Sequence, residues 1–282
     1  MPGPLALLDS LSPTAAARVA YPLLVTPGPR LKVRAADAPT MDDARTNTLK
    51  VRGRRVVSYE WGSGSSVVLL VHGWRGRASQ FASLVRELRY AGHTVVAFDA
   101  PACGASEGSR TDAGDYLEVM RAMQSRHGAF TGIVGHSFGA LVGLAAIREG
   151  LTAARFAGIA SIPDAGHLMT SFAERVGLGA TANEHLVRRF HRLRFSDGPD
   201  ILERFSGIRN PVGVPTLFVH DADDREVPVT ASEALHAAHG PSSTLVVTRG
   251  QGHARVLGAD GVLDQVVGFL AAEPARVGGA AL

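Results

Sequence analysis

The stretch "GHSFG", residues 135–139, decides how the chain around it folds. The apolar run "FTGIV" (130–134) precedes it, and the helix-forming "ALVGLAAIREG" (140–150) follows it. A serine on a tight turn between a strand and a helix projects its hydroxyl into the crevice, and the cramped turn needs small residues two positions to either side, here Gly135 and Gly139. The pattern therefore predicts that Ser137 is a nucleophile rather than an ordinary polar residue at a turn.

Strand and helix patterns alternate on both sides of this turn. Apolar runs at 65–73, 93–101, 155–162, 214–221 and 243–249 predict buried strands, and segments with helical periodicity separate most of them. Two further short strands, joined by a turn at Gly53, are predicted within 46–62. Strands and helices that alternate at this spacing indicate βαβ units. We therefore expect an α/β fold with a mostly parallel twisted sheet flanked by helices.

The alternation breaks between the sixth and seventh predicted strands. Residues 162–210 carry two or three helix-like stretches without a strand between them, which predicts a small helical cap inserted after the sixth strand. The predicted organisation is a helical arm at 1–46, a core at 47–161 and 211–282, and the cap at 162–210. The arm is expected to lie on the body of the protein or loosely on a membrane surface.

The composition is that of a globular protein. With 282 residues and 45% apolar composition, the chain can bury a large core, as one α/β domain with an insertion or as two small domains. The formal charge of +3 comes from arginines scattered through most segments, which argues against nucleic acid as a partner. The single cysteine, Cys103, excludes an internal disulfide and a cysteine-cluster metal site, and we expect it to be a small buried residue.

The chain has no obvious export or membrane signal. No run approaches the roughly 18 uninterrupted apolar residues of a membrane span. The N-terminal stretch lacks a basic segment before its apolar residues, and Asp9 and prolines interrupt it. We therefore expect a cytoplasmic protein without an integral membrane segment.

Chemically active side chains follow the predicted strands directly. In an open α/β sheet, ligands bind beyond the carboxyl ends of the strands. The residues at those ends are His72 to Trp74, Asp99, Ser137, Asp164, Asp221 to Asp224, and His253. A serine nucleophile needs a histidine that takes its proton and a carboxylate that orients the histidine.

Among the eleven histidines, His253 is the best candidate for the base, because it is predicted to lie in a glycine-rich loop (250–257) directly after the last strand. His72 is expected to brace the neighbouring loop and His136 to point elsewhere. His220 is expected to be a satisfied core or rim residue. The cap histidines His167, His185 and His191 are interpreted as surface or lining residues.

Two backbone N–H groups are predicted to stabilise a developing oxyanion. Phe138 follows the serine at the first position of the predicted helix, where N–H groups favour negative charge. The second donor is predicted to be Trp74, because Gly73 lets that loop approach closely.

Three aspartates within four positions, Asp221, Asp223 and Asp224, are candidates for the orienting acid. The stretches "LLVHGW" (69–74), "FDAPACGASEG" (98–108), "GHSFGA" (135–140), "PTLFVHDADDREVP" (215–228) and "GQGH" (250–253) resemble the strand-end motifs of the α/β-hydrolase family. In that family's pattern H-G-x-x-D-x-x-V-P, the catalytic acid matches Asp224, while Asp221 replaces a glycine. The family's Pro-Gly-x-Gly turn is Pro-Ala-Cys-Gly here (101–104). Asp164 is the alternative acid, since in some members the acid follows that earlier strand.

The resemblance implies a serine hydrolase of the carboxylesterase type, since the haloalkane dehalogenases and epoxide hydrolases of the family carry aspartate in place of the serine. We expect cleavage of a small-molecule carboxylic ester through an acyl-serine intermediate, with no cofactor and no metal. A thioesterase, a carbon–carbon bond hydrolase, a perhydrolase and a non-catalytic ligand-sensing relative are the alternatives. The oligomeric state stays open.

The cap is expected to set substrate selectivity. Met169 and Phe172 are predicted to bind substrate, together with Leu168 and Val187 at helical spacings, and a short cap predicts short to medium acyl chains. The alternative is that these residues only dock the cap onto the core. The cap arginines Arg188, Arg189, Arg192 and Arg194 are interpreted either as a solvated helix face or as the entrance for an anionic group.

Overall fold

A central sheet organises the molecule. The computed structural model describes residues 3–272, so residues 1–2 of the predicted arm and 273–282 of the predicted core lie outside the described residues. Within that range the sheet has eight strands in the order β1-β2-β4-β3-β5-β6-β7-β8. The strands are β1 (Arg45–Val51), β2 (Arg54–Trp61), β3 (Val67–Val71), β4 (Thr94–Phe98), β5 (Gly132–His136), β6 (Phe156–Ile159), β7 (Thr216–Asp221) and β8 (Ser243–Thr248).

The strands pair as the sequence predicts for an α/β fold. β1 pairs antiparallel with β2, and β2 pairs antiparallel with β4. All pairs from β4 to β8 are parallel. The strands from β3 to β7 are buried almost throughout, which explains why they are continuous apolar runs rather than alternating ones.

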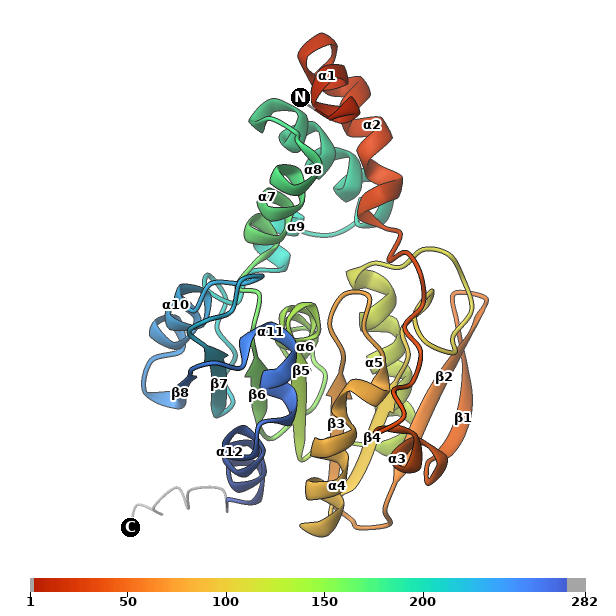
Figure 1. Cartoon of the computed structure of the whole chain (residues 1–282), viewed down its shortest axis with the longest axis vertical. Coiled ribbons are helices and arrows are strands. Elements are labelled where there is room, and N and C mark those ends of the chain that lie inside the picture. Colours follow the sequence, from red (N-terminus) through yellow and green to blue (C-terminus); the bar gives the residue numbers. More distant parts are fainter. Residues whose placement is uncertain (1–2, 273–282) are drawn as a thin grey trace, which may run out of the picture.

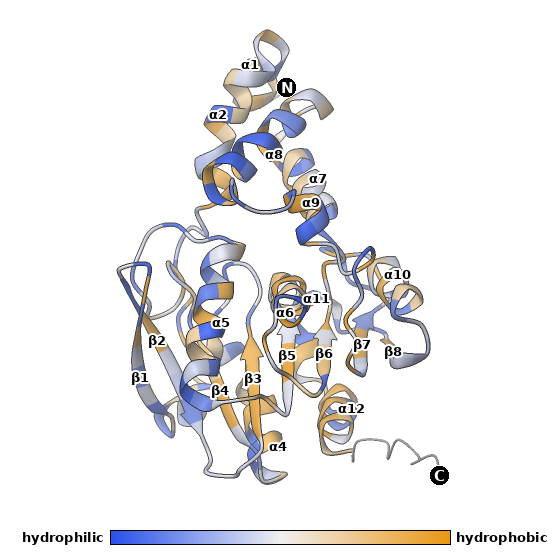
Figure 2. Ribbon diagram, turned by 180° about the vertical axis from the view of Figure 1, so that it is seen from behind, coloured by the Kyte–Doolittle hydropathy of each residue, from blue (hydrophilic) through white to orange (hydrophobic). Residues whose placement is uncertain are grey.

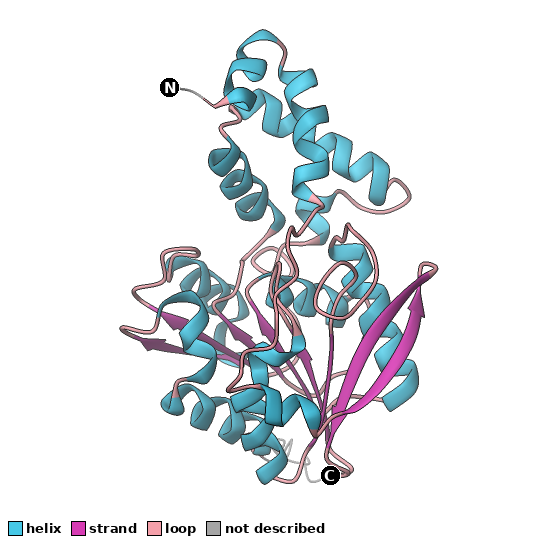
Figure 3. Cartoon of the chain, turned by 45° about the vertical axis from the view of Figure 1, so that its right-hand side comes forward, coloured by secondary structure: helices cyan, strands magenta, loops and turns pink. Residues whose placement is uncertain are grey.

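Helices cover both faces of the sheet (Figure 3). One face packs against α5 (Ala113–His127), α6 (Phe138–Arg148) and α10 (Thr230–His239). The other face packs against α4 (Ala82–Tyr90) and α12 (Asp260–Ala271), with the short α3 (Ala38–Asp42) beside α4. Each face therefore has its own apolar core, and the carboxyl ends of the parallel strands are the edge left for a site.

Five helices stand above that edge (Figure 1). α7 (Ala165–Val176), α8 (Ala180–Arg194) and α9 (Ile201–Arg204) come between β6 and β7, and α1 (Pro4–Leu11) and α2 (Pro13–Leu24) come from the N-terminus. We call these five helices the lid. The alanines Ala16, Ala17 and Ala20 of α2 pack on α7 and α8 in a small apolar core of the lid's own.

The first two helices of the N-terminal arm therefore pack on the inserted helices, whereas α3, near the end of the arm, lies beside α4 on the sheet domain. Small side chains on the buried side of α2 let it approach α8 closely. Two polar contacts link the same pieces: Asp9 accepts a hydrogen bond from the N–H of Gly179, and Thr14 Oγ1 lies 2.8 Å from His185 Nδ1. The arm helices α1 and α2 and the inserted helices α7 and α8 form one packed group although they are far apart in the sequence. The division of the chain into arm, core and cap stays a prediction.

Candidate active site

Ser137 lies between the last residue of β5 and the first residue of α6. Its backbone has φ 53° and ψ −117°, in the left-handed range that non-glycine residues rarely adopt. Such a conformation costs of the order of 1–3 kcal/mol and persists only where the surroundings hold it. The N–H of Ser137 donates to the carbonyl of Ile159 at 2.9 Å, which ties the turn to β6.

Glycines make this turn sterically feasible. A Cβ on Gly135 would overlap the backbone of Ala140, and one on Gly139 would overlap the carbonyl oxygens of Val71 and His72. These contacts explain the small residues two positions to either side of the serine. A Cβ on Gly73 would lie 3.2 Å from the Cβ of Ser137, so the loop after β3 passes directly beside the serine, as its predicted role requires.

His253 is hydrogen-bonded to one of the three candidate aspartates. Its Nδ1 lies 2.7 Å from Asp224 Oδ2, while Asp224 Oδ1 accepts the N–H groups of Glu226 and Val227 at 2.8 and 3.0 Å. With Nδ1–H donated to the carboxylate, Nε2 is the free acceptor of a neutral His253. His253 lies on a short helix, α11 (Gly252–Arg255), rather than in the loop that its glycine-rich surroundings predicted.

Asp224 is held as a carboxylate. Burial by itself raises its pKa, but hydrogen bonds from His220, His253 and the two backbone N–H groups outweigh that effect and hold the pKa below its ordinary value. His220 is fully buried, with Nε2 2.9 Å from the carbonyl of Val227 and 3.4 Å from Asp224 Oδ2. His220 is thus a satisfied core residue, as predicted, and it also supports the acid.

The other acidic candidates are committed to local structure. Asp221 accepts hydrogen bonds from Thr248 Oγ1 and from the N–H groups of Gln251 and Gly252, while Asp223 accepts one from Gly250. Both carboxylates therefore hold the turn that carries His253. Asp164 caps the N-terminus of α7 by accepting the N–H of His167.

His136 is the residue that the sequence reasoning missed. It was expected to point elsewhere, but its ring lies 4.8 Å from that of His253, and its Nε2 is 2.9 Å from the carbonyl oxygen of His253. His136 therefore donates to the backbone that carries the candidate base. Burial, with a smaller contribution from the charge of His253, lowers the pKa of His136 to about 3. Only its position next to Ser137 could have suggested this role.

This buried histidine predicts an acid-dependent loss of stability. The folded-state pKa of His136 is about 3, whereas an unfolded chain binds the proton near pH 6.5. Above about pH 6.5 His136 is neutral in both states, so it does not make stability depend on pH. Below that pH, its contribution lowers the free energy of unfolding by about 1.4 kcal/mol per pH unit. Urea unfolding of the wild type and of His136→Gln between about pH 6.5 and 4.5 measures the difference. Equal slopes in the two proteins would contradict the assignment.

The loop after β3 is braced from below. His72 is buried, its Nε2 accepts the N–H of Ala100 at 3.0 Å, and its Nδ1 lies 2.8 Å from the carbonyl oxygen of Gly73. Tyr116 also donates to the carbonyl of Gly73. Burial lowers the pKa of His72, so the ring stays neutral and bridges the two loops. This arrangement matches the bracing role predicted for His72.

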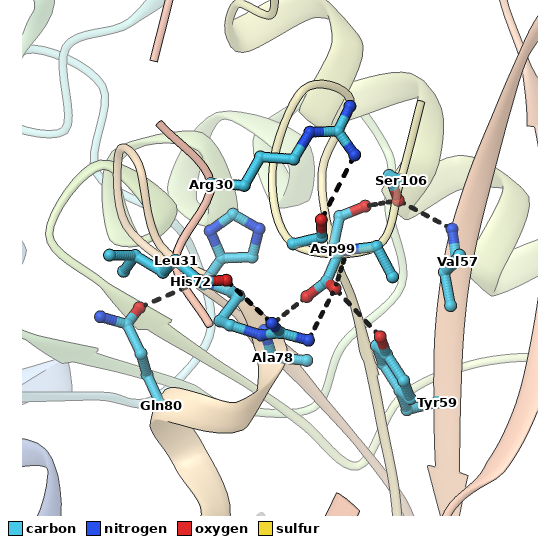
Figure 4. A network of polar contacts seen from close by, with 12 residues as sticks. Arg30, Leu31, Val57, Tyr59, His72, Ala78, Gln80, Asp99 and Ser106 are labelled. Carbon is cyan, nitrogen blue, oxygen red and sulfur yellow. Dashed lines mark hydrogen bonds and ion pairs between the residues drawn. The ribbon is translucent and has the colours of Figure 1, made fainter. Parts of the chain in front are cut away.

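Asp99, at the end of β4, connects several segments below the same loop (Figure 4). Its carboxylate accepts the N–H groups of Ala78 and Ala105 and the hydroxyl of Tyr59, and it lies 3.5 Å from the guanidinium of Arg77. Burial and the Asp99 charge raise the pKa of Tyr59. The side chain is fully buried, so these donors offset the cost of removing a charge from water. Asp99 is therefore structural rather than part of the reaction centre.

A cavity of about 580 Å³ brings most of the predicted site residues together. Ser137, Phe138, Trp74 and His253 line its floor, and Met169 and Phe172 of α7 line its wall. Asp224 lies behind His253, and Cys103 is buried outside the lining. The lining is mainly apolar, which suits an acyl chain or another apolar group.

The N-terminal arm completes the cavity. Residues 23–28, from the end of α2 onward, line it together with α7, Phe190 of α8, and α9. The N–H of Thr111 donates to the carbonyl of Val25, which fixes the chain at the end of α2 to the core. The sequence did not indicate that the arm reaches the site, because no local pattern in residues 23–28 identifies a binding surface.

The four cap arginines do not line this cavity. Arg188, Arg189 and Arg192 border a separate groove between α2 and α8, and Arg194 pairs with Asp112 and Asp115 at the start of α5. Arg194 therefore anchors the lid to the core. The structure does not support the interpretation of these arginines as the entrance to the Ser137 cavity.

Comparison with known families agrees with the fold that the strand order shows. A family model described as "Alpha/beta hydrolase family" matches residues 68–265. The chain belongs to the alpha/beta hydrolase family. Membership confirms the resemblance and the fold class inferred from the sequence, and it places the protein among hydrolases. No curated protein sequence matches.

Solved alpha/beta hydrolase structures resemble this one at low identity. An esterase from Pyrococcus furiosus is 17% identical with a TM-score of 0.65, covering 87% of this chain and 97% of its own. The mouse alpha/beta hydrolase domain-containing protein 10 is 17% identical with a TM-score of 0.63, covering 80% of this chain and 97% of its own. Epoxide hydrolase A from Mycobacterium thermoresistibile is 18% identical with a TM-score of 0.58, covering 80% and 98%. These similarities establish the fold.

Within residues 3–272, no helix is both long and apolar enough to cross a membrane. In the same range, no group of three or more histidine, cysteine, aspartate or glutamate side chains is arranged to hold a metal ion.

Proposed function

We propose that the protein is a serine hydrolase that cleaves carboxylic esters, with Ser137 as nucleophile, His253 as general base and Asp224 as the orienting acid. One observation carries the proposal: Ser137, on its strained turn, lines the same apolar cavity as His253, whose Nδ1 is hydrogen-bonded to Asp224. A purely structural role requires none of these three features.

The proposed reaction begins when Nε2 of His253 takes the Ser137 hydroxyl proton as Oγ attacks the ester carbonyl carbon. The tetrahedral intermediate then collapses, and the alcohol leaves with the proton from His253. Water, deprotonated by the same nitrogen, attacks the acyl-serine, and the bond to Ser137 Oγ breaks as Oγ takes the proton back from His253, which releases the acid. Asp224 stabilises the imidazolium and stays ionised throughout, consistent with its lowered pKa.

The oxyanion is proposed to lie between the N–H groups of Phe138 and Trp74. Phe138 is the first residue of α6, whose N-terminal end favours negative charge. Trp74 lies across from it, with the two rings 5.4 Å apart in an edge-to-face contact. The bracing of Gly73 by His72 and Tyr116 holds this loop before substrate arrives, which is what electrostatic stabilisation of a transition state requires.

The proposed substrates are small esters with short to medium acyl chains. The walls contributed by the arm and by α7 are mainly apolar, and a cavity of about 580 Å³ has room for a small ligand. Thioesters use the same chemistry, so the assay should compare both.

A fluorophosphonate probe followed by intact-mass measurement tests the proposal. One probe per chain is expected on Ser137, because only an activated serine reacts. A panel of acyl esters and thioesters of graded chain length then identifies the substrate class. A chain that stays unlabelled while folded would favour a non-catalytic, ligand-sensing protein instead.

The lid is predicted to set chain-length selectivity. Replacing Phe172 or Met169 with alanine removes part of the cavity wall and enlarges the cavity. The acyl chain length that is cleaved fastest should therefore increase. Each additional buried methylene, worth about 0.8 kcal/mol, should raise kcat/KM for the longer ester about fourfold relative to wild type. The ester panel measures this shift, and Phe269→Ala on α12, distant from the cavity lining, is the matched control.

Fluorophosphonate labelling should be unchanged in both lid variants, because neither side chain takes part in activating the serine. If the chain-length optimum stays the same in both variants, Met169 and Phe172 only dock the lid onto the core.

A further inference from the structure

Exposed apolar side chains are concentrated on the lid. Of the eight large hydrophobic residues that are exposed within residues 3–272, five lie on lid helices. Leu7 and Leu11 on α1 are 55% and 84% exposed, and Val19 and Leu23 on α2 are each 51% exposed. Leu193 on α8 is 49% exposed. We call the first four residues the arm face. Within each helix its two members are four residues apart and therefore share one side.

Packing within the lid does not account for the arm face. The alanines of α2 already fill the contact with α7 and α8, and the only charged residue of α2 is Arg18. A surface helix normally turns charged and polar residues outward, as α8 does with Glu184, Arg188 and Arg192. Figure 2 shows this difference, with α8 largely blue and α1 and α2 largely pale or orange.

Positive charge lies beside the arm face. A groove of about 150 Å³ between α2 and α8 is lined by Arg18, Arg188, Arg189 and Arg192, together with His185. Glu184 is the acidic side chain paired with Arg188, at 3.6 Å. Exposed apolar residues next to several cations are the combination that binds an anionic lipid surface, where apolar side chains enter the interface and cations contact the headgroups.

The arm face shares one residue, Leu23, with the lining of the cavity. Leu23 is half exposed on the outside of α2 and lines the cavity that contains Ser137. A surface held against the arm face would therefore contact a residue that also lines the candidate active site.

We propose that the arm face, with the arginines between α2 and α8, docks the protein on an anionic phospholipid bilayer. The docking is peripheral, because among the described residues no helix is long and apolar enough to cross a membrane. The docking stands on the lid surface alone, whereas the delivery of ester substrates from the bilayer to Ser137 rests on the proposed function.

Co-sedimentation of the full chain with vesicles tests the docking. Vesicles of phosphatidylcholine with phosphatidylglycerol should bind the protein more strongly than phosphatidylcholine alone, and added salt should weaken the binding. The double variant Leu11→Ser/Val19→Ser should lower the partition coefficient roughly tenfold or more, because two apolar side chains no longer enter the interface. Arg18→Gln/Arg192→Gln should lower it by a similar factor, but only for the anionic vesicles.

Tyr90→Ser/Val247→Ser is the matched control, since these exposed apolar residues, 94% and 47% accessible, lie on the core rather than the lid. It should bind vesicles like the wild type. Equal binding to both vesicle types, or equal loss in the control and in Leu11→Ser/Val19→Ser, would overturn the proposal. Light scattering without lipid gives a third check: a dimer that the arm-face variant abolishes would mean that a second copy covers this face.

Fluorophosphonate labelling of the same proteins in buffer separates the two proposals. If Ser137 is labelled equally in all variants while vesicle binding differs, docking is supported and the esterase chemistry is intact. If vesicle binding follows the prediction but no serine is labelled, the proposed function fails and the docking stands.

Discussion

Ser137→Ala is expected to lower kcat/KM for a small aryl ester by roughly four to six orders of magnitude. The reason is that loss of a triad serine removes the bond-forming atom, and the remaining binding and oxyanion groups supply only a small part of the catalysis. Alanine fits the turn sterically, because the neighbouring glycines, not the hydroxyl, make the left-handed conformation at Ser137 feasible. Release of the aryl alcohol, followed by absorbance, measures the loss.

Ser171→Ala is the matched control for this experiment. Ser171 also lines the cavity, from α7, but it lies on a helix rather than at the turn after β5. Its variant should retain nearly full activity, and urea unfolding should show that both proteins stay folded. A Ser137→Ala enzyme that keeps more than a tenth of the wild-type rate would rule out the nucleophile assignment.

Asp224→Asn is expected to lower turnover by roughly 10³- to 10⁴-fold. An amide in place of the carboxylate no longer stabilises the imidazolium, and it favours the wrong tautomer of His253 by presenting an N–H where an acceptor is needed. The two backbone N–H groups of Glu226 and Val227 still find an acceptor in the amide oxygen, so the fold is expected to persist. Steady-state rates at neutral pH measure the effect.

Three other asparagine variants are the controls. Asp221→Asn, Asp223→Asn and Asp164→Asn should each cost far less turnover, because these carboxylates hold the turn before His253 or cap α7 rather than contact the imidazole. Asp221→Asn is expected to lower stability, since its buried carboxylate accepts several hydrogen bonds. A larger loss of turnover in Asp164→Asn than in Asp224→Asn would show that Asp164, which follows β6, is the orienting acid.

The alternation of strands and helices could be predicted from the sequence because it depends on local periodicity. Fully apolar runs of the length of β3 and β5 bury both faces wherever they pair. The turn at Ser137 could also be predicted, because it requires small residues at positions 135 and 139, and both lie within a stretch of five residues. The family resemblance pointed to Asp224 among three aspartates within four positions, and in the structure Asp224 is hydrogen-bonded to His253.

Contacts between distant segments were not predictable from the sequence in this way. The packing of α2 on α8 depends on small side chains about 170 positions apart, and no local pattern shows which surface a run of alanines will meet. The position of His136 against His253 depends on how β5 and α11 approach each other at the end of the sheet.

The arginines of α8 show the difference most clearly. By itself the sequence determined that these residues lie on an amphipathic helix, because helical periodicity is a property of neighbouring residues. Only the tertiary structure decided that Arg194 reaches Asp112 on the core while Arg188 and Arg192 face the groove beside α2. The physical reason is that the interactions of a charged side chain depend on the groups within a few ångströms of it, and those groups come from segments that only folding brings together.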